Sequence, residues 1–322
     1  MSSSSVQAAP AKKFVIKSFK NPAVLDVTAA QATWASLEGA IDEIYNKNAS
    51  QLSFEESYRY CYNLVLHKHG ELLYTGVTGV FKRHLQQTVE SVVATPNEHL
   101  LSAISVAWSE HKVAMSMVAD ILMYMDRTYV TQHKKVPVYK LSLHIFRDVI
   151  IYHPGVRDRL RAIVLDNIAN ERNGYLVDRD QMKSTLAMLV DLGVDGLGVY
   201  EEEFERHFLD ATRIFYRQES TEFLSQNTCP DYMWKAEQRL AEEAQRVVHY
   251  LALSTEPKLK HLMESELVHA HARTLVEMDT SGCICLMRDD KMDDLKVRPL
   301  ACLEMRLVCE RSLTSRHTNP LS

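Results

Sequence analysis

Hydrophobic side chains recur along most of the chain at spacings of three and four residues, which is the period of one helical face. The first stripe consists of Trp34, Leu37, Ile41 and Ile44. The pattern Thr28-Ala-Ala-Gln31, which precedes this stripe, is a capping-box signature and predicts that the first helix begins there.

The second stripe is unusual because its members are large aromatic side chains: Phe54, Tyr58 and Tyr62, at positions i, i+4 and i+8. Ser53 stands at the expected N-cap of this helix, and Gly70 is a typical residue for its C-terminal stop. A row of aromatic groups with polar ends suits a helix that packs on one side and contacts a partner on the other. The row therefore favours binding over catalysis.

The helical period continues to about residue 280, and no segment shows a convincing alternation of period two. The longest predicted helix carries the stripe Met115, Val118, Leu122, Met125 and Tyr129, a methionine-rich seam typical of core packing. The predicted fold class is all-α, with helices joined by short loops. After the second helix, further helices are expected over 72–94, 98–131, 138–152, 156–172, 179–192, 200–227, 231–252 and 257–280.

Composition agrees with long helices, since the 322 residues include only 10 glycines and 9 prolines. The net charge of -5 argues against nucleic acid as the main partner, because phosphate binding requires clustered lysine and arginine. No run approaches the roughly 20 apolar residues that span a bilayer, and the first residues lack the apolar segment of a secretory signal. The six cysteines include no CxxC pair, which favours a protein with reduced cysteines. Together these features predict a protein of the cytoplasm and nucleus without membrane contact.

Candidate catalytic and metal-binding groups are few. The chain has no glycine-rich phosphate loop and none of the GxSxG, HExxH or EF-hand motifs. Helical side chains at i, i+2 point about 200° apart, so exposed or capping roles are expected for His67 with His69 and for His269 with His271. The acidic runs Glu201–Glu203 and 289–294 are expected at a helix start and in a polar turn, with their charges solvated or facing the helix dipole. The sequence thus predicts no catalytic residue, no metal and no cofactor.

The two ends of the chain depart from the helical pattern. Residues 1–13 are rich in Ser, Ala and Pro, and the apolar patch Phe14-Val-Ile-Lys-Ser-Phe19 follows them. Two interpretations of this patch stay open: a strand-like clip on the protein's own surface, or an arm that folds onto a partner. From about Lys296 to Ser322 the helical period fades, so this tail is expected to be poorly packed.

Several stretches agree, in order, with one known family. They include Leu52-Ser-Phe-Glu-Glu56, Val65-Leu-His-Lys-His-Gly-Glu-Leu-Leu-Tyr-Thr-Gly76 and Ile121-Leu-Met-Tyr-Met-Asp-Arg127. On these motifs, residues 14–295 resemble the N-terminal region of cullins, of the type that recruits BTB-domain adaptors. The resemblance implies an elongated stalk of cullin repeats, each a five-helix bundle. The implied division is a flexible arm at 1–22, a first, adaptor-binding repeat at 23–152, a second repeat at 153–280, and the start of a third repeat with a divergent tail at 281–322.

The resemblance also implies which residues bind the adaptor. In cullins of this type the adaptor packs on the second helix and on the end of the long fifth helix, which correspond here to Leu52, Ser53, Phe54, Glu55, Tyr58, Arg59 and Tyr62, with Tyr124 and Arg127 opposite. The arm is expected to insert Phe14, Ile16 and Phe19 into a groove on the adaptor's helical 3-box. Two alternatives stay open: Tyr62 as a core tyrosine, and Arg127 paired with Asp126 or with a helix C-terminus.

The implied function is that of a non-catalytic scaffold subunit of a cullin-RING E3 ubiquitin ligase, which binds adaptors made of a BTB domain and a 3-box. The cullin-homology domain, which holds the RING-box subunit and accepts Nedd8, is expected beyond the end of this chain. RING-box binding is therefore expected only of a full-length form, and a truncated cullin that competes for adaptors without ligase activity is one alternative. The alternative function is a generic helical-repeat interaction protein, for example of the vesicle-tethering kind, that shares only its architecture with cullins.

Overall fold

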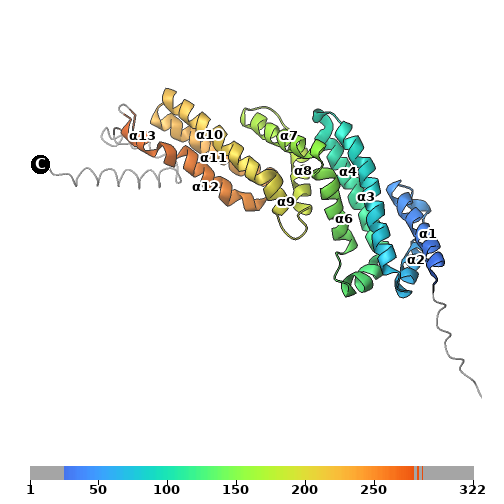
Figure 1. The fold of residues 1–322 in the computed structure, drawn as a ribbon. Helices are drawn as coiled ribbons and strands as arrows, with labels where there is room; N and C mark the ends of the chain where they lie inside the picture. The colour runs from blue at the N-terminus through green and yellow to red at the C-terminus, as the bar shows by residue number, and fades with distance from the viewer. Residues whose placement is uncertain (1–24, 279–280, 283–284, 286–322) are drawn as a thin grey trace, which may run out of the picture.

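The computed structural model describes residues 25–278, 281–282 and 285, and every regular element within them is helical. This confirms the predicted all-α class. The helices pack side by side in an elongated array, from α1 and α2 at one end to α12 and α13 at the other (Figure 1). The α-helices are α1 Val27–Tyr45, α2 Phe54–Leu66, α3 Gly70–Ala94, α4 Asn97–Ile121, α5 Met123–Met125, α6 Val138–Phe146, α7 Pro154–Arg172, α8 Arg179–Asp191, α9 Gly198–Tyr200, α10 Arg206–Gln226, α11 Cys229–His249, α12 Glu256–Leu267 and α13 Ala272–Glu277.

The helix starts show which capping signals the folded chain uses. Ser53 caps α2 as predicted, because its hydroxyl oxygen accepts the backbone N–H of Glu56 at 3.2 Å. The capping box at Thr28 was the wrong choice for α1, since that helix begins at Val27 and its N-cap is Asp26. A carboxylate directly before the first turn satisfies the same free backbone groups, and two candidate caps so close together cannot be ranked from the sequence alone.

Gly70 does not stop α2, which corrects the prediction made for it. The helix ends at Leu66, and Lys68 reverses the chain with a positive φ of 66°. Gly70 instead begins α3, where a Cβ atom would lie 2.3 Å from the Tyr129 ring. The glycine is therefore needed for close packing between α3 and the segment after α5, rather than for a left-handed backbone conformation.

Three predicted helices include a π-helical turn, which inserts an extra residue into the helical repeat. The predicted helix over 98–131 consists of α4, α5 and one such turn in succession, and the helix expected over 257–280 is interrupted after Leu267. Met115, Val118, Leu122 and Met125 are nevertheless fully buried, so these four positions of the predicted core stripe are confirmed, whereas Tyr129 is only half-buried. The π turns are η2 Asp126–Val130, η3 Arg147–Ile151 and η4 Glu201–Glu205, and the short 3₁₀ segments are η1 Ala49–Gln51, η5 Leu253–Thr255 and η6 His269–His271.

The acidic run at residues 201–203 is not wholly solvated, contrary to the sequence prediction. Glu203 is only 4% exposed, and its carboxylate accepts hydrogen bonds from Arg157 at 2.6 Å and from Arg161 at 2.9 Å. Burial alone raises the pKa of Glu203, but the two guanidinium groups outweigh this effect and hold the pKa below its usual value. The π turn η4 carries this carboxylate inward, towards arginines of α7.

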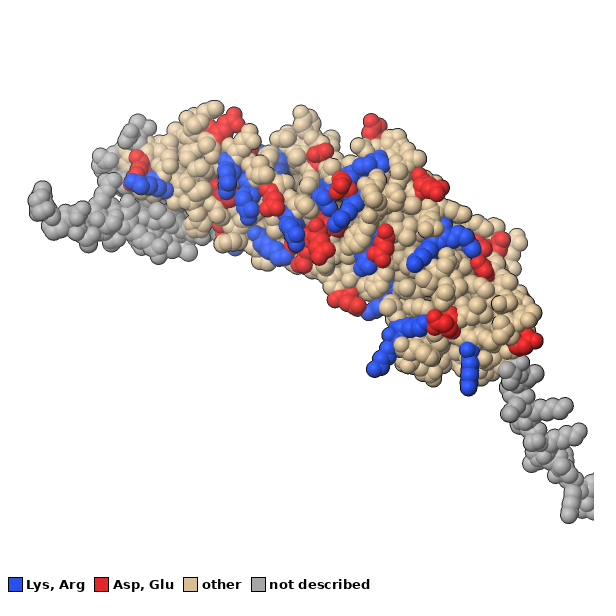
Figure 2. All heavy atoms as spheres, in the orientation of Figure 1, with Lys and Arg blue, Asp and Glu red and all other residues tan. Residues whose placement is uncertain are grey.

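Packing between the helices places α2 at one end of the array. α1 contacts α2, α3 and α4, and α5 packs against α2, while α4 also contacts α7 and α8. One hydrophobic core cluster runs through these helices and on into α10, α11 and α12. On the face that Figure 2 shows, acidic and basic side chains are intermixed along the array. The repeat boundaries at residues 152 and 280 stay predictions.

Candidate functional site

The outward face of α2 presents the aromatic row that the sequence predicted. Phe54 is 53% exposed and Tyr62 is 37% exposed, whereas Tyr58 between them is half-buried. The rings of Phe54 and Tyr58 lie 6.5 Å apart and are inclined by 20°. On the opposite face of α2, Cys61 and Leu64 are fully buried in the core. The helix is therefore amphipathic, with aromatic groups on the side that faces solvent.

α5 extends this row across to a second element. The rings of Tyr62 and Tyr124 lie 4.6 Å apart and are inclined by 49°, although the two residues are distant in the sequence. Contacts between α2 and α5 bring the two tyrosines together. Because Tyr62 keeps more than a third of its surface exposed, the alternative that it is a core tyrosine is wrong. Phe54, Tyr58, Tyr62 and Tyr124 are called the aromatic surface below.

Arg127 lies beside the aromatic surface on the π turn η2 and is exposed. Asp126, its neighbour, is directed elsewhere: its two carboxylate oxygens accept the backbone N–H of Val138, at 3.0 and 3.2 Å. In the described part of the chain, no ion pair joins Arg127 to Asp126, so that pairing is not what the structure shows, and the pairing of Arg127 with a helix C-terminus stays an open alternative. Asp126 thereby fastens η2 to the start of α6.

The remaining predicted residues surround the aromatic surface. Glu55 and Arg59 are exposed on α2, and Leu52 is half-buried just before it, packed against the core. Ser53 is exposed, but its hydroxyl oxygen is used by the helix cap. The nine predicted residues therefore lie on α2, on the two residues before it, on α5 and on η2, and the contacts between α2 and α5 bring these segments together. The three arm residues, Phe14, Ile16 and Phe19, lie outside the described residues.

Sequence reasoning missed two apolar side chains of the same region. Leu66 is 45% exposed at the end of α2, and Met123 is 37% exposed beside Tyr124 on α5. Leu66 continues the four-residue spacing of Phe54, Tyr58 and Tyr62, so the pattern itself carried the signal. Met123 had no comparable signal, because its exposure depends on where the chain bends after α4.

Within the described residues, no group of three or more His, Cys, Asp or Glu side chains is placed to hold a metal ion. The predicted histidine pairs have structural partners: the ring of His69 bonds the backbone oxygen of Leu25 at 3.0 Å, and the ring of His271 bonds the Ser220 hydroxyl at 2.8 Å. In the part of the chain that the structure describes, no helix has the length and apolar character to cross a bilayer.

Comparison with known proteins identifies the family. The model of the cullin α-solenoid domain matches residues 34–298. The chain belongs to the cullin family. It is 42% identical to Cullin-3B of Arabidopsis thaliana over 284 residues, which cover 88% of this chain and 38% of that protein. It is also 41% identical to Cullin-3 of Dictyostelium discoideum over 292 residues, which cover 90% of this chain and 38% of that protein.

A third relative, Cullin-3 of Caenorhabditis elegans, is 38% identical over 276 residues, 85% of this chain and 36% of that protein. The predicted resemblance to the cullin-3 type is therefore confirmed. The chain spans less than two fifths of the length of these relatives.

Proposed function

We propose that this cullin is a non-catalytic scaffold subunit of a cullin-RING E3 ubiquitin ligase and that it recruits BTB-domain substrate adaptors. Family membership and the similarity to cullin-3 proteins support the scaffold role. In a full-length form the same protein would also hold a RING-box subunit. Its proposed location is the cytoplasm and nucleus.

The observation that carries adaptor binding is the contact between Tyr62 and Tyr124 beside the exposed Phe54. It joins α2 and α5 into one continuous aromatic surface on a rigid helical support. Large aromatic side chains that are exposed in the free protein and can enter a partner's pockets are typical hot spots of protein interfaces. A generic helical solenoid has no structural need for exposed rings such as Phe54 and Tyr62, because neither of them belongs to the hydrophobic core.

Charged residues at the edge of the aromatic surface are proposed to set the orientation of the adaptor. Glu55 and Arg59 are exposed on α2, and Arg127 is exposed on η2. Charges at the rim of an interface mainly steer association and exclude wrong partners, and they contribute less to affinity than buried anchors do. Substitutions at these positions are therefore expected to change association rates more than dissociation rates.

The N-terminal arm is proposed as a second contact with the adaptor, through Phe14, Ile16 and Phe19 in a groove of the 3-box. Deletion of residues 1–20 should weaken binding while leaving the helical circular dichroism spectrum unchanged, since α1 begins only at Val27. Unchanged affinity after this deletion would remove the arm from the proposal and leave the aromatic surface as the adaptor contact.

The deciding experiment is a calorimetric titration of the chain with a purified BTB–3-box protein. The double variant Phe54→Ala/Tyr58→Ala should lose binding. Trp234→Ala is the matched control, because Trp234 is 60% exposed on α11, which lies far from α2 along the array (Figure 1). Absence of binding by the folded wild-type chain would favour a generic helical-repeat interaction protein. Equal losses in the double variant and the control would show that the aromatic surface is not the binding site.

A further inference from the structure

Tyr124 does not belong to α2, so other contacts must hold it against Tyr62. It lies on α5, which continues without a loop into the π turn η2. Residues 123–130 are called the α5–η2 segment below. Met125 and Val130 are buried and attach one side of this segment to the core. The contacts on its other side therefore help to decide whether Tyr124 stays in the aromatic surface.

The chain reverses directly after the α5–η2 segment, and the reversal returns Lys135 to it. Lys134 has a left-handed φ of 51°, and its backbone N–H donates to the carbonyl oxygen of Thr131 at 3.4 Å. The backbone N–H of Lys135 donates to the carbonyl oxygen of Val130 at 3.0 Å. This pair of bonds around a left-handed residue is the Schellman motif of helix ends. The Lys135 side chain therefore starts beside the last turn of the segment.

The Lys135 ammonium lies over two tyrosine rings that belong to different helices. It is 4.7 Å from the ring centre of Tyr74 on α3 and 5.3 Å from that of Tyr129 on η2. Only 26% of the Lys135 side chain is exposed. A cation at such a distance is attracted to the negative face of an aromatic ring, more strongly where water is excluded. Lys135 therefore links the α5–η2 segment to α3.

Glu71, in the first turn of α3, completes this link. Its carboxylate accepts hydrogen bonds from the Lys135 ammonium, at 2.5 Å, and from the Tyr129 hydroxyl. These two bonds lower the pKa of Glu71 to about 2, so the carboxylate is ionised at neutral pH. An exposed ion pair alone contributes little, but this carboxylate is shared by two donors that also contact each other's surroundings through the rings. Glu71, Tyr74, Tyr129 and Lys135 are called the Lys135 cluster below.

We propose that Lys135 is a positioning residue for adaptor binding, and that its cluster holds the α5–η2 segment where Tyr124 contacts Tyr62. This inference rests on the proposed function. A segment that occupies its binding position only part of the time binds a partner with an affinity reduced by that fraction. Loss of the Lys135 ammonium should therefore weaken adaptor binding about fivefold, which corresponds to the strength of one ammonium–ring contact.

The test is a calorimetric titration of the Lys135→Met chain with a purified BTB–3-box protein. Methionine keeps the approximate length of the side chain and removes its charge, whereas Lys135→Arg keeps the charge and should bind like the wild type. Lys112→Met is the matched control. The Lys112 ammonium lies 3.2 Å from the Asp191 carboxylate and 5.4 Å from the ring centre of Trp108. It makes the same two kinds of contact away from the α5–η2 segment, between α4 and the end of α8.

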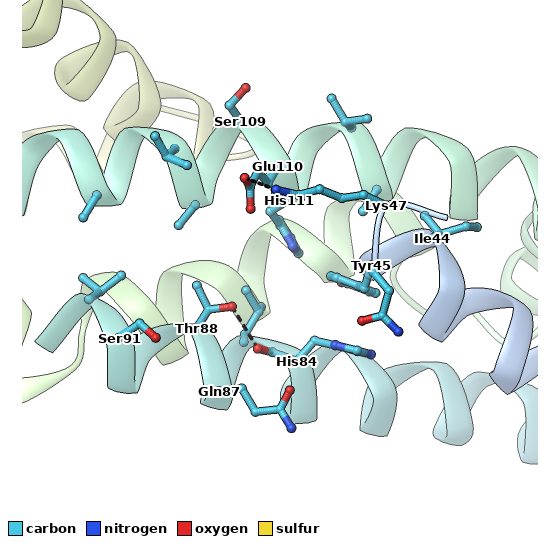
Figure 3. Close-up of a pocket in the computed structure, with 18 of the residues that line it drawn as sticks. Ile44, Tyr45, Lys47, His84, Gln87, Thr88, Ser91, Ser109, Glu110 and His111 are labelled. Atoms are coloured by element: carbon cyan, nitrogen blue, oxygen red, sulfur yellow. Dashed lines mark hydrogen bonds and ion pairs between the residues drawn. The ribbon is translucent and has the colours of Figure 1, made fainter. Parts of the chain in front are cut away.

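Lys47→Met is a second control, because it removes an ion pair of the same length. The Lys47 ammonium lies 2.5 Å from the Glu110 carboxylate in the groove between α3 and α4 that Figure 3 shows. None of the residues that line this groove belongs to the Lys135 cluster or to the aromatic surface. Both control substitutions should leave the affinity for the adaptor unchanged.

A double-mutant cycle separates positioning from direct contact with the adaptor. Lys135→Met should weaken binding by less than about twofold in the Tyr124→Ala chain, because the side chain that the cluster positions is then missing. Equal weakening in the wild-type and Tyr124→Ala chains would show that Lys135 acts independently of Tyr124, and it would overturn the proposal.

Amide hydrogen exchange of the free chain provides a measurement that needs no adaptor. Exchange within residues 123–130 should be faster in Lys135→Met and unchanged in Lys112→Met, because only the first substitution releases this segment. Unchanged exchange in Lys135→Met would overturn the proposal. If the wild-type chain and Lys135→Met bind the adaptor equally well, only the positioning role fails. If the folded wild-type chain does not bind, the proposed function fails, and this role with it.

Discussion

Substitution of Phe54 by alanine is the perturbation with the most direct consequence for adaptor binding. Phe54 begins α2 and is 53% exposed, so about half of its surface is available to a partner. A phenylalanine buries roughly 200 Å² when fully enclosed, which leaves about 100 Å² to be covered by the adaptor. At about 25 cal/mol per Å², this area corresponds to about 2.5 kcal/mol, or roughly a 60-fold weaker dissociation constant.

The assay is calorimetric titration of wild-type and Phe54→Ala chains with the same BTB–3-box protein. Trp234→Ala provides the control, because it removes an aromatic side chain of similar exposure from another helix and should leave affinity unchanged. Denaturation of each variant in urea separates binding from folding, and Phe54→Ala should change stability little, since the side chain lies mainly in solvent. An affinity change of less than about threefold, with the fold intact, would refute the area argument and the role of Phe54 as an anchor.

Three predictions concern stability. Ser53→Ala removes the N-cap acceptor of α2 and should lower the free energy of unfolding by about 1 kcal/mol in urea denaturation, whereas Ser53→Asp should preserve it. Glu243→Gln should lower the free energy of unfolding by about 3 kcal/mol, because this 2%-exposed carboxylate accepts hydrogen bonds from two buried arginines. A loss below about 1 kcal/mol would contradict this role of Glu243. Burial raises the pKa of Glu171 and of Glu203, but their hydrogen-bond partners outweigh this effect and lower both pKa values: the Tyr250 hydroxyl and two arginines at Glu171, and two arginines at Glu203. Their contribution is therefore complete above the unfolded pKa of about 4.3 and is lost as the pH falls through the lower folded values, so denaturation midpoints should drop as the pH falls below about 4. A midpoint that stays constant there would argue against these interactions.

The surface proposed for adaptor binding was largely visible in the sequence, because one helix carries most of it. The spacing of Phe54, Tyr58 and Tyr62 follows from the helical period alone, and Ser53 marked the start of that helix correctly. Tyr124 could be placed opposite this row only through the resemblance to cullins. Its contact with Tyr62 depends on how the chain bends after α4, which periodicity does not record.

The sequence by itself determined the class of the fold and the core face of its helices, since a stripe such as Met115, Val118 and Leu122 requires a buried side wherever the helix packs. Only the tertiary structure decided what each remaining face meets. Glu203 is buried because Arg157 and Arg161 lie across from it, whereas Val106 and Val113 of α4 remain exposed although they are apolar. Helical period is a property of one segment, whereas pairing and exposure depend on neighbours that are remote in the chain.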